Sequence, residues 1–144
     1  MYDTILVPTD GSDQAAVAAT HAIDIAAMRS ATVHVLSVVD DRAFLLLDDD
    51  RVSGVRADLR ANARDAIDDA ATAALGRDLE VETAIETGHP AERIVDYAAD
   101  HGVDLIVMGT SGDEYETNVV GSVSQRVVRQ APTPVLTVGP DVDG

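Results

Sequence analysis

The chain has 144 residues, 46% of them hydrophobic, and its 26 acidic and 10 basic residues give a formal net charge of −16. This length and apolar content predict one globular domain over residues 1–144. The acidic surface excludes nucleic-acid and membrane partners because it repels phosphate groups, and the absence of cysteine excludes disulfides and thiolate catalysis.

Short β-branched runs alternate with helical stretches along the first half of the chain. Residues 4–8 are apolar and end in a Thr-Asp-Gly-Ser turn, which predicts a buried strand. Residues 13–28 repeat alanine and isoleucine at helical spacing, with Ser12 as the expected cap. Residues 32–39 predict a second strand, which an acidic loop follows. Residues 51–75 carry one apolar stripe and predict a long amphipathic helix.

The second half of the chain continues this alternation. Residues 79–85 alternate apolar and polar side chains and predict a half-exposed strand near a sheet edge. The Gly-His-Pro run at 88–90 begins a third helix, and residues 103–108 predict a buried fourth strand. The Ser-x-x-Gln spacing at 122–125 is typical of a capping box before a fourth helix, and residues 135–138 predict a fifth strand. This order predicts an α/β domain with an open five-stranded parallel sheet and helices on both faces.

Two loops rich in polar residues and glycine follow the first and fourth strands. Ligands of open parallel sheets bind outside the carboxyl ends of the strands, where the strand order reverses. The Thr-Asp-Gly-Ser turn supplies a carboxylate and hydroxyls there, and the alternative is that its aspartate serves only to shape the turn. The glycine loop after residue 108 leads to a helix whose free N–H groups favour an anion. Together the two loops can hold a nucleotide.

Three pieces of the sequence resemble the universal stress protein family. They are Pro-Thr-Asp-Gly-Ser at 8–12, Gly-His-Pro at 88–90, and a glycine loop that runs from Met108 to Val123. Their order and spacing extend the resemblance over essentially the whole chain. It implies a Rossmann-like fold that binds adenine nucleotides, in a cytoplasmic stress-response regulator that works as a homodimer. The protein partner that such a regulator would address is unknown.

The family's ATP site implies a role for ten residues of this chain. The nucleoside would contact Pro8, Thr9, Asp10, Val38, Met108 and Gly109. The phosphates would be bound by backbone N–H groups and a hydroxyl of Gly112, Gly121, Ser122 and Val123. Magnesium, if present, would be held by the phosphates. We expect no catalytic and no metal-binding residue, because the histidines are scattered and the glycine loop has no lysine.

The glycine loop departs from the family's pattern in length and in charge. Eight residues separate Gly112 from Gly121 where the pattern has nine, and three of them are acidic, namely Asp113, Glu114 and Glu116. Carboxylates near a triphosphate would oppose its binding. Two functions therefore stay open: a nucleotide-binding regulatory module, and a dimeric interaction module that does not bind ATP. A slow ATP hydrolase is a third alternative.

Composition also bears on environment and assembly. All of the 10 basic residues are arginine, and molar salt would screen the repulsion among the acids, so the composition is typical of a halophilic archaeon. The N-terminus lacks the pattern of a signal peptide, and the chain lacks an apolar stretch of about 18 residues, which predicts a cytoplasmic protein. Residues 135–138 are expected at a sheet edge, where this strand would pair with its twin in a homodimer.

Overall fold

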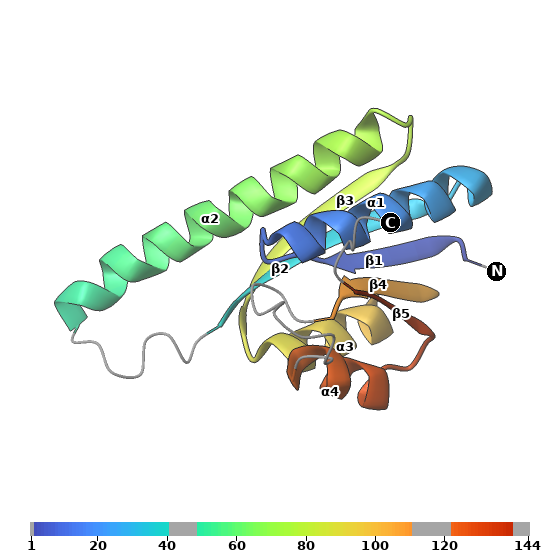
Figure 1. Cartoon of the computed structure of the whole chain (residues 1–144). Coiled ribbons are helices and arrows are strands. Elements are labelled where there is room, and N and C mark those ends of the chain that lie inside the picture. The colour runs from blue at the N-terminus through green and yellow to red at the C-terminus, as the bar shows by residue number, and fades with distance from the viewer. Residues whose placement is uncertain (1, 41–48, 111–121, 140–144) are drawn as a thin grey trace.

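The computed structural model describes residues 2–40, 49–110 and 122–139, in which strands and helices alternate (Figure 1). The strands are β1 (Thr4–Pro8), β2 (Thr32–Asp40), β3 (Val81–Gly88), β4 (Leu105–Gly109) and β5 (Val135–Val138). The helices are α1 (Asp13–Arg29), α2 (Asp49–Leu75), α3 (Pro90–Asp100) and α4 (Ser122–Gln130). Within these described ranges, none of the helices is long and apolar enough to cross a membrane.

The five strands form one parallel sheet in the order β3-β2-β1-β4-β5. Its register places Ile5 of β1 opposite Val33 of β2 on one side and Leu105 of β4 on the other. The chain builds the sheet from β1 outward to β3, crosses back, and adds β4 and β5. Strand order therefore reverses between β1 and β4, which is where such sheets bind ligands. The predicted fold class is confirmed, as are the edge positions of β3 and β5.

Helices cover both faces of the sheet (Figure 1). On one face α1 and α2 pack over a core that includes Val7 and Val35, and on the other α3 and α4 pack over Leu6 and Leu36. Successive residues of a strand point to opposite faces, so a strand that is covered on both sides must be apolar at every position. This explains the unbroken Ile-Leu-Val run of β1.

Alanine dominates the helical side of the first interface. Ala18, Ala22 and Ala26 of α1 and Ala70 and Ala74 of α2 are buried against the sheet. Alanine lets a helix approach a sheet closely, but each methyl group removes less apolar area from water than leucine would. The stability of this layer is therefore spread over many small contacts. Because each contact contributes little, repulsion among surface charges is larger relative to the free energy of packing than it would be in a layer of bulky side chains.

Several predicted boundaries differ from the observed ones. β3 begins at Val81 rather than at residue 79, because the chain after α2 first turns through Asp78, whose φ is 61°. β4 begins at Leu105 rather than at residue 103, and the Asp104 carboxylate before it accepts hydrogen bonds from the N–H groups of Asp3 (2.9 Å) and Thr4 (3.1 Å). Finally, α4 already includes residue 122 as its first helical residue, so that serine is not the N-cap that a capping box requires.

Candidate functional site

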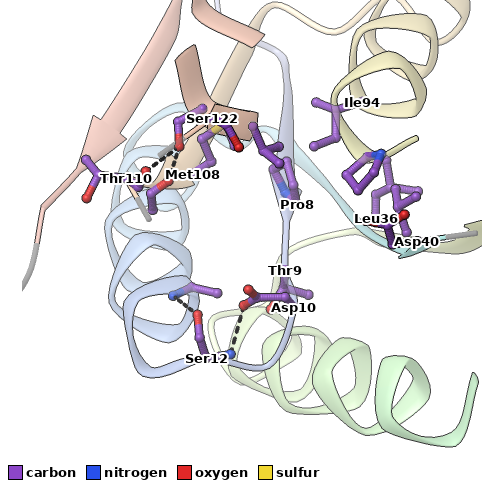
Figure 2. Close-up of a pocket in the computed structure, with 16 residues that line it drawn as sticks. Pro8, Thr9, Asp10, Ser12, Leu36, Asp40, Ile94, Met108, Thr110 and Ser122 are labelled. Atoms are coloured by element: carbon purple, nitrogen blue, oxygen red, sulfur yellow. Dashed lines mark hydrogen bonds between the residues drawn. The ribbon is translucent and has the colours of Figure 1, made fainter. Parts of the chain in front are cut away.

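A pocket of about 470 Å³ opens at the carboxyl ends of β1, β2 and β4, where the strand order reverses (Figure 2). Its volume lies within the range of about 300–1,000 Å³ that is usual for small-molecule sites. Eight of the ten residues that the sequence points to line it: Pro8, Thr9, Asp10, Val38, Met108, Gly109, Ser122 and Val123. The other two, Gly112 and Gly121, and the acidic residues between them lie outside the described residues. Three distant segments of the chain thus meet at one pocket.

The turn between β1 and α1 shapes one wall of the pocket. The Asp10 carboxylate accepts a hydrogen bond from the N–H of Ser12 at 2.9 Å, and Gly11 takes up φ 81°, a left-handed conformation that favours glycine. The Ser12 hydroxyl in turn accepts from the N–H of Ala15 at 3.1 Å, which confirms the predicted cap of α1. Asp10 therefore does shape the turn. Its carboxylate still has acceptor capacity for a ligand, because two oxygens offer about four lone pairs.

Buried polar side chains tie the elements around the pocket together. The Thr110 hydroxyl donates to the Gln14 side-chain oxygen at 3.1 Å, which links the end of β4 to α1. The Ser124 hydroxyl lies 2.6 Å from the carbonyl oxygen of Thr110 and 3.1 Å from that of Gly109, which links α4 to the same point. Gln14, Thr110 and Ser124 are all buried. Bonds of this kind hold the pocket walls in fixed relative positions.

The sequence reasoning missed several residues of the pocket. They are Ser12, Ala15, Leu36, Asp40, Pro90, Ile94, Thr110 and Ser124. Strand alternation could have found two of them, because Leu36 and Asp40 lie two positions on either side of Val38 and so share its face. No motif marks Ser124, whose only signal is a hydroxyl on the apolar face of a helix.

The electrostatics of the pocket differ from one side to another. Helices α1, α3 and α4 all present their N-terminal turns to it, through Ala15, Pro90 and Ser122. Helix N-termini carry free N–H groups and a partial positive charge, which attract anions. Asp10 and Asp40 are the acidic residues among the described lining residues, so beside these two carboxylates the pocket favours hydrogen-bond donors of a ligand, whereas the helix ends favour an anion. Within the described ranges, acids and histidines do not gather into a group that could hold a metal ion.

A second set of titratable side chains lies on the face of the sheet that α3 covers. His34 of β2 is buried, with Nδ1 2.7 Å from the hydroxyl of Tyr97 in α3 and Nε2 3.1 Å from the Glu82 carboxylate in β3. Because a carboxylate only accepts hydrogen bonds, the ring proton of neutral His34 belongs on Nε2, and Nδ1 accepts from the Tyr97 hydroxyl. His101 stacks on Tyr97 with ring centroids 3.8 Å apart. These contacts hold α3 against the sheet and thereby position Pro90 and Ile94, which line the pocket.

The free energy of unfolding should decrease in acid because of His34. Burial lowers the pKa of His34 from its ordinary value of 6.5, an effect that the Glu82 carboxylate opposes and His101 reinforces. Burial also raises the pKa of Tyr97 above its ordinary 10.0, with Glu82 and Glu86 adding to the shift, so the phenol keeps its proton. Since the unfolded chain takes up a proton at His34 before the folded one does, we expect stability to fall as the pH drops below about 6.5.

Thermal melts between pH 7.5 and pH 5.5 in molar potassium chloride would measure this effect. His34→Gln keeps a donor and an acceptor but does not titrate, so its loss of stability over this range should be smaller than that of the wild type. His21→Gln, at an exposed position of α1, is the matched control and should follow the wild type. Equal pH dependence of all three proteins would contradict the role of His34.

Comparison with known proteins agrees with the fold and the motifs. A model of the universal stress protein family matches residues 1–139. A universal stress protein of Methanocaldococcus jannaschii is 36% identical over 140 residues, which are 96% of this chain and 82% of that protein. The structure of universal stress protein UspA from Lactobacillus plantarum is similar with a TM-score of 0.86 and 37% identity, over 95% of this chain and 97% of that one.

A further solved structure is that of a universal stress protein in complex with cAMP, with a TM-score of 0.73 and 27% identity over 95% of this chain and 97% of that one. The family model covers nearly all of the chain, and two relatives exceed 35% identity over almost its whole length. Together these matches show that the chain belongs to the universal stress protein family.

Proposed function

We propose that this stress-response protein binds ATP or a related adenine nucleotide in the pocket and acts as a regulatory module. The observation that carries the proposal is the separation of polar groups around the pocket. Figure 2 shows Ser122 and Thr110 on one side, Asp40 on the opposite side, and Asp10 apart from both, with Pro8 between them. A ligand that fits must present hydrogen-bond donors to the carboxylates and an anion to the helix ends.

A nucleotide has this distribution of groups. Its base can lie among the apolar side chains of Leu36, Val38 and Ile94, and its ribose hydroxyls and amino groups can donate to carboxylates. Its phosphates can accept from N–H groups at the start of α4 and from the Ser122 hydroxyl. The family relative solved with cAMP supports an adenine nucleotide as the ligand class.

Binding without efficient hydrolysis is the activity that we propose. None of the described lining residues is a histidine, lysine or arginine, so this part of the pocket offers no cationic side chain to stabilise a transferring phosphoryl group. Magnesium would be held by the phosphates of the nucleotide. Release of phosphate from Mg-ATP in molar potassium chloride tests the proposal, and turnover faster than about 1 per second, in the range of ordinary enzymes, would contradict it.

Calorimetric titration with Mg-ATP in molar potassium chloride tests the binding itself. Asp10→Ala should weaken binding by roughly one to two decades, because a hydrogen bond to a charged group is worth about 1.5–3 kcal/mol. Asp13→Ala is the matched control, because Asp13 is an exposed acid three residues further on that does not line the pocket. It should leave the affinity nearly unchanged.

The same titration separates the proposal from its alternative. If the folded wild-type protein takes up no ATP, the protein is a dimeric interaction module of the same fold that does not bind ATP, as the short acidic loop between Gly112 and Gly121 suggests. If ATP binds but Asp10→Ala and Asp13→Ala behave alike, the nucleotide does not use the turn between β1 and α1.

We also propose that the protein is a homodimer formed through β5. This strand lies at the end of the sheet, and its residue Leu136 is 38% exposed. An edge strand whose outer N–H and C=O groups lack a sheet partner is a template for pairing with a second copy. Leu136→Arg should convert the dimer to a monomer, because a charged side chain would have to be buried in the interface.

Light scattering at micromolar concentration in molar potassium chloride would measure the mass, against 15.1 kDa for one chain. Leu75→Arg is the matched control, since Leu75 is 59% exposed at the end of α2, away from β5. It should remain dimeric. A monomeric wild type, or an equal response of both variants, would count against an interface at β5.

A further inference from the structure

Asp40 lines the pocket as the last residue of β2. Leu36, Val38 and Asp40 follow one another at every second position of β2 and therefore share one face of the strand, and all three line the pocket. Figure 2 shows Asp40 beside Leu36 on the side opposite Ser122. The Asp40 backbone is held in the sheet, in register with Gly88 of β3. The carboxylate is thus presented from a rigid element rather than from a loop.

The surroundings of Asp40 determine which group of a ligand its carboxylate can bind. Leu36, Val38 and Ile94, which line the pocket together with Asp40, are apolar side chains that cannot form hydrogen bonds. An ionised carboxylate accepts hydrogen bonds and donates none, and its two oxygens leave room for a ligand contact beside any bond within the protein. A ligand that reaches Asp40 is therefore favoured if it carries an N–H group there. It is disfavoured if it carries a carbonyl oxygen, because two acceptors face each other.

We propose that Asp40 is a specificity-determining residue that accepts a hydrogen bond from the exocyclic amino group of the base, and so selects adenine over bases with a carbonyl at that position. This inference rests on the proposed nucleotide function and names the feature of the ligand that the site recognises. A purine placed among Leu36, Val38 and Ile94, with its phosphates at the start of α4, points the edge remote from the ribose toward Asp40.

ATP and inosine triphosphate form the sharpest pair of probes, since inosine triphosphate replaces the 6-amino group of ATP by a carbonyl oxygen. Calorimetric titration of both, in molar potassium chloride with magnesium, should give wild-type affinities that favour ATP on the order of ten- to a hundredfold. Asp40→Ala should weaken the binding of ATP and bring the affinities for ATP and inosine triphosphate to within about threefold of each other. Asp40→Asn keeps the shape of the side chain and adds a donor, so it should raise the affinity for inosine triphosphate.

Glu86→Gln is the matched control. Glu86 lies opposite Val38 on the neighbouring strand β3 and lines a separate groove, so the variant removes a carboxylate close to the same strand without touching the pocket. It should keep the wild-type preference for ATP. Thermal melts would show whether each variant is folded. If Asp40→Ala does not fold, Asp40→Asn by itself still tests the preference for ATP.

The outcomes separate this inference from the proposed function. A wild-type protein that binds ATP and inosine triphosphate equally, or a preference that survives both Asp40 variants, would overturn the role of Asp40 while nucleotide binding stands. A change of preference in Glu86→Gln equal to that in Asp40→Asn would also overturn it, because the effect would then be one of net charge. A folded wild type that binds neither nucleotide would overturn both proposals.

Discussion

Transfer from molar potassium chloride to dilute buffer should lower the melting temperature by on the order of 10 °C or more. The net charge of −16 leaves many acidic groups without a basic counterpart. The Debye length is about 3 Å in molar salt and about 30 Å at 0.01 M, so in dilute buffer these groups repel one another across the whole molecule. Ion pairs offset little of this, because a pair such as Arg77 and Asp24, 2.9 Å apart, lies on the surface.

Circular dichroism melts at several potassium chloride concentrations would measure the shift. Asp65, Asp68 and Asp69 are exposed on adjacent turns of α2, where like charges three or four residues apart repel. A variant with all three changed to asparagine should depend less on salt than the wild type. An unchanged melting temperature between dilute buffer and molar salt would contradict the proposal that this composition is an adaptation to a halophilic archaeal cytosol.

Gly109→Val should both destabilise the protein and block the pocket. Gly109 is the last residue of β4, and a Cβ atom there would lie 3.2 Å from the Gln14 Cβ and 3.3 Å from the Gln14 carbonyl carbon and oxygen. Valine adds two further methyl groups in the same place. We expect a loss of about 1–3 kcal/mol in the free energy of unfolding, as overpacking usually causes, and displacement of α1 from β4. Because Thr110 and Ser124 are bonded at this point, the pocket walls should move as well.

Denaturant melts and calorimetry with ATP would measure the two effects of this substitution. ATP affinity should fall by about tenfold or more, beyond what the remaining folded fraction accounts for. Gly54→Val is the matched control, because a Cβ atom at Gly54 meets nothing within 4 Å. It should change stability by less than about 0.5 kcal/mol and leave binding intact. A Gly109→Val protein that binds ATP like the wild type would place the nucleotide outside this pocket.

Local sequence by itself determined the elements and their order. The apolar run of β1, the Ser12 cap of α1 and the proline that begins α3 act through neighbours a few residues away, so their effects can be read along the chain. The alternation of strands and helices then admits few topologies, because crossovers between parallel strands are right-handed. This is why the sheet and both its edges agreed with expectation. Most of the predicted pocket residues came together because they follow strand ends, which meet at one edge of a parallel sheet.

Only the tertiary structure decided which side chains meet across elements. His34 and Tyr97 are 63 positions apart, and Ser124 and Thr110 are 14 apart, yet each pair is within hydrogen-bond distance. Such a bond forms only within about 3 Å and in the right direction, so it depends on how a helix seats on the sheet and on the register of the strands. Along the chain His34 is only one polar residue in an apolar strand, and Asp40 only the start of an acidic stretch. Their surroundings, and hence their chemistry, arise when α3 packs over β2.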